Sequence, residues 1–412
     1  MTNTKTDIVV KVLGIGGCGC NNVWRVIRDD DPIAHFSLMA ANTDGQNLDV
    51  LFGVDNERVK LWASQFTALK LGDGTAKQLG GGGDPEVGAR ETEKSADEIE
   101  AFVKDADILL IVSGLGKATG SGGTPVVARI AKDLGVATIA VCTQPLMSEG
   151  ARRAEKADLA KAQILSAVPT ILIHNDAVNQ VLQEEDDKLP SWVWDHINKI
   201  SVVSIIRHLR EISQVMGNVT NSDVADLRTA LTFGNELWFN TWHVPNGKVT
   251  EDDIKSNLLT NRFLDSKILE SSSAISTWLH GKWGFLVTEK VQGQINAICR
   301  DRKPETFWGQ YESEEDRHVS LLAVANTTAS ADVVDQKRIQ RFKPGSVKSM
   351  RCSVDGRPTT LVLPVELVDE WEAEIRKQPA NITRLKELQA TMAEEEAQHR
   401  MPDIPQRIVQ AL

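Results

Sequence analysis

The sequence lacks an excess of positive charge. Its 412 residues carry 46 Lys and Arg against 57 Asp and Glu, which gives a formal net charge of −11. Because nucleic acid and anionic membranes attract Lys and Arg, this balance argues against a protein that coats either of them, and we expect no nucleic-acid partner. A phosphorylated ligand would have to be held by a local site.

The sequence also lacks paired cysteines and long apolar runs. Its five cysteines are not spaced as a disulfide framework would be. No basic segment followed by an apolar one opens the chain as a secretory signal does, and no stretch approaches the roughly 18 uninterrupted apolar residues of a membrane span. We therefore expect a cytoplasmic protein without direct membrane insertion, so that any membrane role would need a partner.

No set of metal-ligating residues stands out. Cys18 and Cys20 form a C-x-C pair, but no second Cys or His cluster completes a four-ligand site. We interpret the two cysteines as small loop residues, and no metal ligand is assigned.

The sequence does contain a repeated strand and helix pattern. Hydrophobic residues make up 41% of the chain, enough for a sizeable core. Five short apolar runs of the N-terminal half each end in a glycine-rich or polar turn: "DIVVKVLGIGG", "FSLMAANTD", "ADILLIVSGLG", "VATIAVCTQP" and "PTILIHND". With helices between them, these runs predict an α/β fold with a Rossmann-like parallel sheet, whose ligands bind at the carboxyl ends of the strands.

Composition and pattern divide the chain into four segments. The parallel-sheet domain covers residues 1–190, and residues 191–234 hold one long central helix, from near Trp192 to Gly217, with the loop after it. Residues 235–364 mix helix and strand and predict a second, smaller α/β domain. Residues 365–412 predict charged C-terminal helices with a thin apolar stripe and a short tail.

Glycine-rich loops gather at the predicted ligand edge of the sheet. "GIGGCGCNN" lies between a strand and a helix, where backbone N–H groups can approach an anion. Alone it would fit a dinucleotide site, with Asp44 in about the place of the ribose-binding acid, so an NAD-dependent oxidoreductase is an alternative. Four further loops count against it: "NTDGQNL", "LGGGGDPEVG", "GLGKATGSGG" and "EGARR". Several loops on one edge favour a ligand with several phosphates.

These motifs, in this order, resemble those of the FtsZ and tubulin superfamily, and FtsZ most closely. The resemblance covers roughly residues 8–235 and includes "GLGKATGSGGTPVVARIAKDLG", which is similar to the tubulin signature, and "NSDVADLR", which resembles the FtsZ catalytic loop. It implies a GTPase that binds GTP or GDP with Mg²⁺ and that partners with itself in a head-to-tail filament. It makes 1–190 the nucleotide-binding GTPase domain and implies a cytoskeletal or cell-division role.

The resemblance also implies which residues hold the nucleotide. By position in the matching motifs they are Gly16, Gly17, Asn21, Asn42, Asp44, Gly81, Gly82, Gly114, Gly116, Lys117, Thr119, Gly120, Ser121, Glu149, Arg153, Asn175, Trp194 and Asn198.

Lys117 and Ala118 replace glycines of the family signature. Lys117 either folds over the phosphates or points to solvent where the backbone no longer needs a positive φ. We favour the second, because the family binds phosphate through backbone and metal without a lysine. If either position requires a positive φ, the strain would cost about 1 kcal/mol or more and reduce nucleotide affinity.

Trp194 and Asn198 are the candidate base-binding pair. They are spaced i and i+4 on one predicted helix face, so that the indole can stack on guanine while the amide oxygen accepts from the base. This arrangement favours GTP over ATP. In the alternative interpretation Trp194 is a core residue and Asn198 is solvated, and Asp195 is the acceptor if the register differs.

The candidate catalytic residues are Asn221, Asp223 and Asp226. The two carboxylates, three residues apart at a helix start, could contact one water or cation behind the γ-phosphate. They could instead be first-turn acids that only complement the helix dipole. The resemblance implies that they act on the nucleotide of the next subunit.

Several outcomes stay open within this family. A divergent filament of a phage, plasmid or specialised compartment is one alternative, and a non-hydrolysing nucleotide-binding scaffold is another, suggested by Lys117 and Ala118. The tail "PDIP" resembles the short tail by which FtsZ binds membrane adaptors, so an adaptor partner is an expectation at Pro402–Pro405. Charged helices stand where FtsZ has a long disordered linker before that tail.

Overall fold

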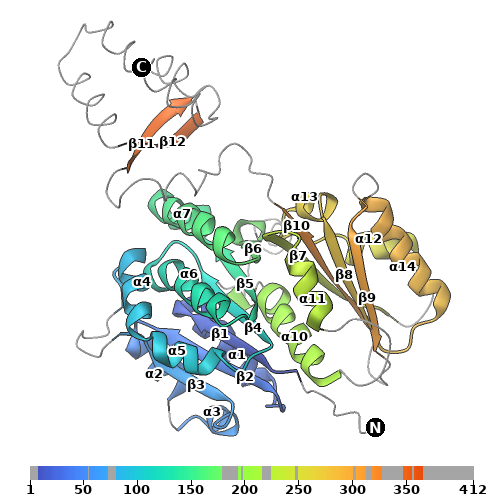
Figure 1. Ribbon diagram of the computed structural model, residues 1–412, viewed down its shortest axis with the longest axis horizontal. Coiled ribbons are helices and arrows are strands. Elements are labelled where there is room, and N and C mark those ends of the chain that lie inside the picture. Colours follow the sequence, from blue (N-terminus) through green and yellow to red (C-terminus); the bar gives the residue numbers. More distant parts are fainter. Residues whose placement is uncertain are drawn as a thin grey trace, which may run out of the picture. The chain divides into compact units, whose positions relative to one another are not determined.

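The computed structural model describes two units of the chain, which divide between Thr327 and Thr328. Figure 1 shows their helices and strands. The described residues are 8–53, 55–72, 80–178, 194–195, 198–215, 224–245, 249–299, 303–311, 317–326, 347–354 and 357–364.

A ten-stranded sheet forms the centre of the first unit, in the order β3-β2-β1-β4-β5-β6-β7-β10-β8-β9. Neighbouring strands from β3 to β7 are parallel, β10 is antiparallel to both β7 and β8, and β8 pairs in parallel with β9. The strands are β1 Val10–Ile15, β2 Phe36–Asn42, β3 Phe66–Lys70, β4 Ile108–Gly114, β5 Ala137–Gln144, β6 Thr170–His174, β7 Glu236–His243, β8 Ala274–His280, β9 Glu305–Tyr311 and β10 His318–Ala325. The expected α/β fold is confirmed.

Helices cover both faces of this sheet. They are α1 Gly16–Asp29, α2 Gly45–Phe52, α3 Glu57–Leu61, α4 Pro85–Lys94, α5 Ala96–Val103, α6 Ala118–Asp133, α7 Ala151–Ala167, α10 Ser204–Val215, α11 Val224–Leu231, α12 Glu251–Asn257, α13 Ser266–Glu270 and α14 Phe285–Ile298. None of the helices in the described ranges is long and apolar enough to cross a bilayer.

Side-chain alternation along the strands builds two hydrophobic cores. In β4, Leu110 and Val112 face a core that includes residues of α1, α2 and α10, while Leu109 and Ile111 face a second core with residues of α5, α6 and α7. The first core continues into β7, β8 and β10. Strands β1, β2, β4, β5 and β6 are mostly buried and are nearly continuous apolar runs, which is why the sequence shows them clearly.

The division of the chain into four segments stays a prediction, and two of these segments contribute strands to the same sheet. Strands from 1–190 and from 235–325 belong to one sheet and share one core. In the second unit the described residues form an antiparallel pair, β11 Val347–Val354 with β12 Arg357–Pro364. The charged helices expected in 365–412 lie outside the described residues.

The central helix differs from the single regular helix that we expected. A π-helical stretch, Lys199–Val203, precedes α10, which ends at Val215. Where the two meet, the hydroxyl of Ser204, the first residue of α10, donates a hydrogen bond of 2.8 Å to the carbonyl of Ser201 in the π-helical stretch. Such side-chain bonds to a carbonyl three residues back compete with regular helical bonding.

Candidate functional site

One cavity of about 650 Å³ lies at the carboxyl edge of the parallel strands. Its volume is in the range of small-molecule sites. Of the expected nucleotide-binding residues, those in its wall are Gly16, Gly17, Asn21, Asn42, Asp44, Gly81, Gly82, Gly114, Lys117, Thr119, Gly120, Glu149, Arg153, Asn175, Trp194 and Asn198. They come from the ends of six strands, β1 to β6, or from the loops and helix starts that follow them, and from the start of the central helix.

Gly116 and Ser121 are the two expected residues that do not line this cavity. The Ser121 hydroxyl is buried and accepts a hydrogen bond of 2.8 Å from the Gly116 backbone N–H. Gly116 has a φ of +91°, and a Cβ there would lie 2.6 Å from the Arg153 backbone oxygen. These two residues therefore shape the loop beneath the cavity wall.

Helices α1 and α6 both begin at the cavity, and glycines bring their first turns close to the strands. A Cβ on Gly19 would lie 2.3 Å from the Val112 oxygen, and one on Gly120 would lie 2.4 Å from the Gly114 oxygen. Neither helix has an acidic residue in its first turn. The unpaired N–H groups and the helix dipoles at these two ends favour an anion in the cavity.

Lys117 and Ala118 do not carry the backbone strain that the sequence raised as a concern. Lys117 is the exposed N-cap of α6, with an extended φ of −121°, and Ala118 begins the helix. In the described ranges, the residues other than glycine that have a positive φ are His35 and Lys303. The Ala118 methyl occupies space that Gly81 leaves, since a Cβ on Gly81 would lie 2.5 Å from it.

The loop after β2 brings oxygen atoms to the cavity. The Asp44 carboxylate caps α2 by accepting from the Asn47 N–H at 3.1 Å, and the Asn42 amide oxygen accepts from the Asp44 N–H at 3.3 Å. The Thr43 and Thr119 hydroxyls share a buried hydrogen bond of 2.7 Å, which joins this loop to the start of α6. One carboxylate and neighbouring amide oxygens are a ligand set that Mg²⁺ accepts together with phosphate oxygens.

Two buried polar atoms in the wall lack protein partners among the described residues. They are the amide oxygen of Asn175 and the Nε of Arg153, whose Nη1 pairs with the Glu149 carboxylate. A buried polar group without a partner costs about 1 to 3 kcal/mol. Because both residues line the cavity, polar atoms of a bound nucleotide could form hydrogen bonds with these two atoms. The wall therefore fits the expected ligand.

Trp194 and Asn198, the candidate base-binding pair, both line the cavity, and Asn198 is 7% exposed. The Asn198 Nδ2 donates to the Trp194 carbonyl at 2.6 Å, while its Oδ1 accepts from Asn22 at 2.8 Å. Asp195, the alternative acceptor, instead pairs with Arg25 at 3.0 Å and does not line the cavity. Both ends of the Asn198 amide are thus bonded within the protein, and its oxygen has a second lone pair that could accept from a ligand.

The wall includes residues that our reasoning from the sequence missed, among them Cys18, Arg25, Thr43, Thr143 and Pro145. Thr143 lies near the end of β5, so the rule that ligands bind at strand ends could have found it. The Cys18 sulfur is 3.4 Å from the Thr143 hydroxyl, and burial raises the pKa of its thiol. Arg25 lies well inside α1, and no local signal in the sequence pointed to it.

The candidate catalytic residues lie apart from this cavity as far as they are described. Asn221 and Asp223 lie outside the described residues. Asp226 is half-buried in the first turn of α11, and Arg228 of that helix donates to the carbonyl of Asp107, just before β4. Gly114, at the other end of β4, lines the cavity. The seven residues of β4 span about 20 Å, so α11 and the cavity lie at opposite edges of the sheet.

Comparison with known sequences gives consistent matches. A family model described as "Tubulin/FtsZ family, GTPase domain" matches residues 9–183. Cell division protein FtsZ 1 of Pyrococcus furiosus is 26% identical over 352 residues, which cover 84% of this chain and 88% of that protein. Cell division protein FtsZ of Aquifex aeolicus is 28% identical over 321 residues, covering 77% of this chain and 82% of the relative.

Solved structures share the fold. An FtsZ dimer of M. jannaschii matches with a TM-score of 0.61 at 23% identity, covering 78% of this chain and 89% of that one. CetZ2 of Haloferax volcanii, described as a GTPγS-bound protofilament, matches with a TM-score of 0.57 at 18% identity, covering 81% and 98%.

Proposed function

Because the chain is a divergent member of the FtsZ/tubulin superfamily, we propose that it is a GTPase that assembles head to tail into filaments. The observation that carries this proposal is the placement of two groups of residues. The glycine-rich loops gather around the cavity at one edge of the sheet, and Asp226 lies at the other edge. A contact between unlike edges cannot close as a dimer does, so repetition gives an open filament.

GTP is the proposed ligand of the cavity. The N-termini of α1 and α6 would hold its phosphates, and Trp194 would stack on its base. Guanine presents an N1–H donor where adenine presents an acceptor. The Asn198 oxygen, which already accepts from Asn22, would accept the guanine N1–H with its second lone pair, whereas adenine offers no donor at that position.

The loop after β2 would hold Mg²⁺. Asp44, with the amide oxygens of Asn42 and Asn47, is the oxygen-rich part of the cavity wall. When bound, the ion would offset the negative charge on the phosphates during hydrolysis. In this chain Asp44 is held toward the cavity by its capping bond to the Asn47 N–H.

Asp226 would act on the nucleotide of the neighbouring subunit. Its carboxylate, with that of Asp223, would orient a water behind the γ-phosphate. Within one chain it lies about the length of β4 from the cavity, too far to touch the nucleotide there. A monomer would therefore bind GTP but hydrolyse it poorly.

We infer a cytoskeletal or cell-division role from the similarity of this chain to known proteins. The two curated relatives are cell division proteins, and the CetZ2 neighbour is described as a protofilament. A divergent filament of a phage, plasmid or compartment stays an alternative. The strain that suggested a non-hydrolysing scaffold is not seen, since neither Lys117 nor Ala118 has a positive φ. Cytoplasmic localisation stays a prediction, and the expected adaptor tail lies outside the described residues.

Turnover measured against protein concentration tests the proposal. The purified full chain, with GTP and Mg²⁺, should show a specific activity that rises steeply with concentration, and filaments should appear in negative-stain electron micrographs over the same range. ATP should support neither. A specific activity that stays constant from dilute to concentrated protein would mean that the site is complete within one chain.

A further inference from the structure

A row of histidines crosses the antiparallel part of the sheet. His243 ends β7, His280 ends β8 and His318 begins β10, and the strand register pairs His318 directly with both others. Residues paired across strands project on the same face. The His280 and His318 rings stack with centroids 4.2 Å apart, and those of His243 and His318 are 5.2 Å apart.

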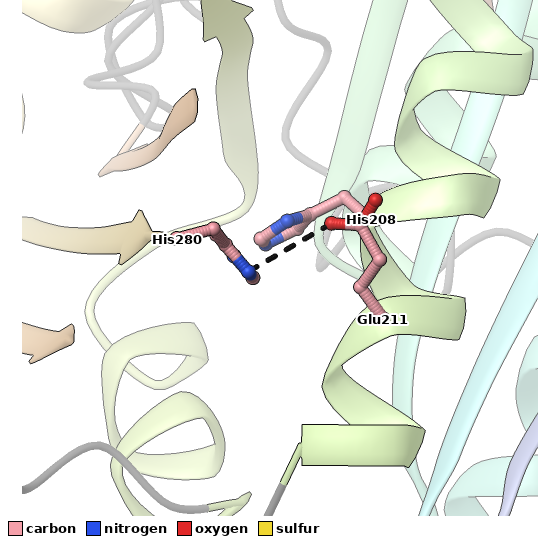
Figure 2. A group of neighbouring side chains, drawn as sticks. All are labelled: His208, Glu211 and His280. Atoms are coloured by element: carbon pink, nitrogen blue, oxygen red, sulfur yellow. Dashed lines mark ion pairs between the residues drawn. The ribbon is translucent and has the colours of Figure 1, made fainter. Parts of the chain in front are cut away.

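Helix α10 adds two further ligand-type side chains. His208 and Glu211 are spaced i and i+3, so they face the same side of the helix. Figure 2 shows both pointing toward His280. One ligand atom from each of His208, Glu211 and His280 can be chosen so that all three lie within 4.8 Å of one another. Around a zinc ion such atoms lie about 3.3 Å apart, given metal–ligand distances near 2.0 Å, so small side-chain rotations would close the set.

His208 has no other interaction that satisfies its ring nitrogens. It is 4% exposed, and neither nitrogen has a hydrogen-bond partner within the described ranges. Its ring neighbours include Phe239 and Trp278, at 5.2 and 4.9 Å. Burying a polar ring without partners costs free energy, and a metal ion would use its lone pair.

We propose that His208, Glu211 and His280 bind a Zn²⁺ ion, with His318 holding the Glu211 carboxylate in place. Two imidazoles and one carboxylate are a known ligand type for zinc, whereas Mg²⁺ prefers oxygen ligands. The His318 Nε2 lies 2.9 Å from the Glu211 Oε2, the kind of supporting contact that orients a metal-binding carboxylate. The Glu211 side chain is 38% exposed, which leaves a path for water to a fourth coordination position.

The protonation states suit a metal. Burial lowers the pKa of His280 to about 4 and that of His208 well below its usual value, so both imidazoles are neutral near pH 7. Burial opposes the charge of Glu211, but its bond to His318 and the surrounding imidazoles outweigh this and lower its pKa. Zinc binding near pH 7 would then release few protons from these three side chains.

The ion would join two parts of the first unit. His208 and Glu211 belong to the central helix, and His280 belongs to a strand far along the chain. His208 follows Asn198 by ten residues, about 15 Å along a helix, so this site is separate from the nucleotide cavity. Zinc should therefore stabilise the fold without replacing the magnesium proposed for the GTP site.

The test measures zinc bound to the full chain after removal of nucleotide and treatment with a chelator. Equilibration with Zn²⁺ and gel filtration should leave about one zinc per chain, measured by elemental analysis, while Mg²⁺ at the same concentration should not compete. Zinc at a hundredfold excess over its Kd should raise the thermal midpoint by about 5 °C. Co²⁺ in place of zinc should give a visible absorption band that zinc abolishes.

Glu211→Gln should weaken zinc binding at least about tenfold, and His280→Gln should do the same. Glu98→Gln, the same substitution at an exposed position of α5, is the matched control and should bind as the parent does. Zinc binding to the parent far below one per chain would overturn the proposal, and so would unchanged affinity in Glu211→Gln. The parent measurement decides even if a variant fails to fold.

Discussion

The two edges of the parallel sheet differ in what they need in order to function. The carboxyl edge has a cavity formed within one chain, with two helix N-termini and the segments that follow six strands, β1 to β6. The opposite edge presents Asp226 in the first turn of α11, and the cavity on which Asp226 would act lies at the carboxyl edge. We therefore expect nucleotide binding to depend on the carboxyl edge and hydrolysis to depend also on the edge with Asp226. A variant at the Asp226 edge should leave nucleotide binding intact.

The largest effect is expected from Asp226→Ala. GTP turnover should fall by about 10² to 10⁴-fold, because the group that orients the attacking water is lost, while GTP affinity stays unchanged and filaments persist longer. Asp97→Ala removes a first-turn acid of α5 and is the control for the helix-dipole interpretation. Turnover assays and nucleotide titrations of both variants give the comparison. A loss of turnover equal in the two variants would argue that Asp226 only complements its helix.

Mixing variants of the two edges sharpens this result. A Cβ on Gly17 meets no atom within 4 Å, so Gly17→Glu should fold and place a carboxylate where the phosphates bind. Mixed with Asp226→Ala, it should restore part of the turnover, since one chain supplies an intact cavity and the other an intact carboxylate. If the mixture is no more active than either variant alone, catalysis is not shared between subunits.

A smaller effect is expected from Asn198→Ala. GTP binding should weaken by roughly 1 to 3 kcal/mol, about 5- to 150-fold, because a base edge would be left unpaired. Asp195→Ala, on the same helix but outside the cavity, should bind GTP as the parent does. Competition between GTP and ATP, measured by calorimetry or fluorescence, checks the assignment. Equal affinity of the parent for both nucleotides would contradict it.

The smallest effect is expected at Lys117. Its backbone is extended and its side chain exposed, so Lys117→Gly should bind GDP within about twofold of the parent. Titrations at two ionic strengths separate this outcome from phosphate contact. If Lys117→Ala weakens binding and reduces its salt dependence, the lysine folds over the phosphates instead.

Contiguous features could be predicted well from the sequence. The α/β fold is confirmed, and the resemblance to the FtsZ/tubulin superfamily is confirmed by a family model that matches residues 9–183. The glycine loops after β1 and β4 were found because strand, loop and helix follow one another directly, so local spacing reports their place. Gly116 and Ser121 were expected to touch the ligand, but their hydrogen bond is internal to the loop, which spacing alone could not reveal.

Interactions within a few residues set the buried strands, the loops that follow them and the glycines that let helices approach them closely, so the amino-acid sequence is enough to predict these features. Packing between distant segments places Asn198 rather than Asp195 in the cavity wall, through bonds to Asn22 and Arg25 on α1. It also placed His280 beside His318 and across from His208. Strand register and helix packing join residues far apart in the chain, and no local pattern encodes which of them meet.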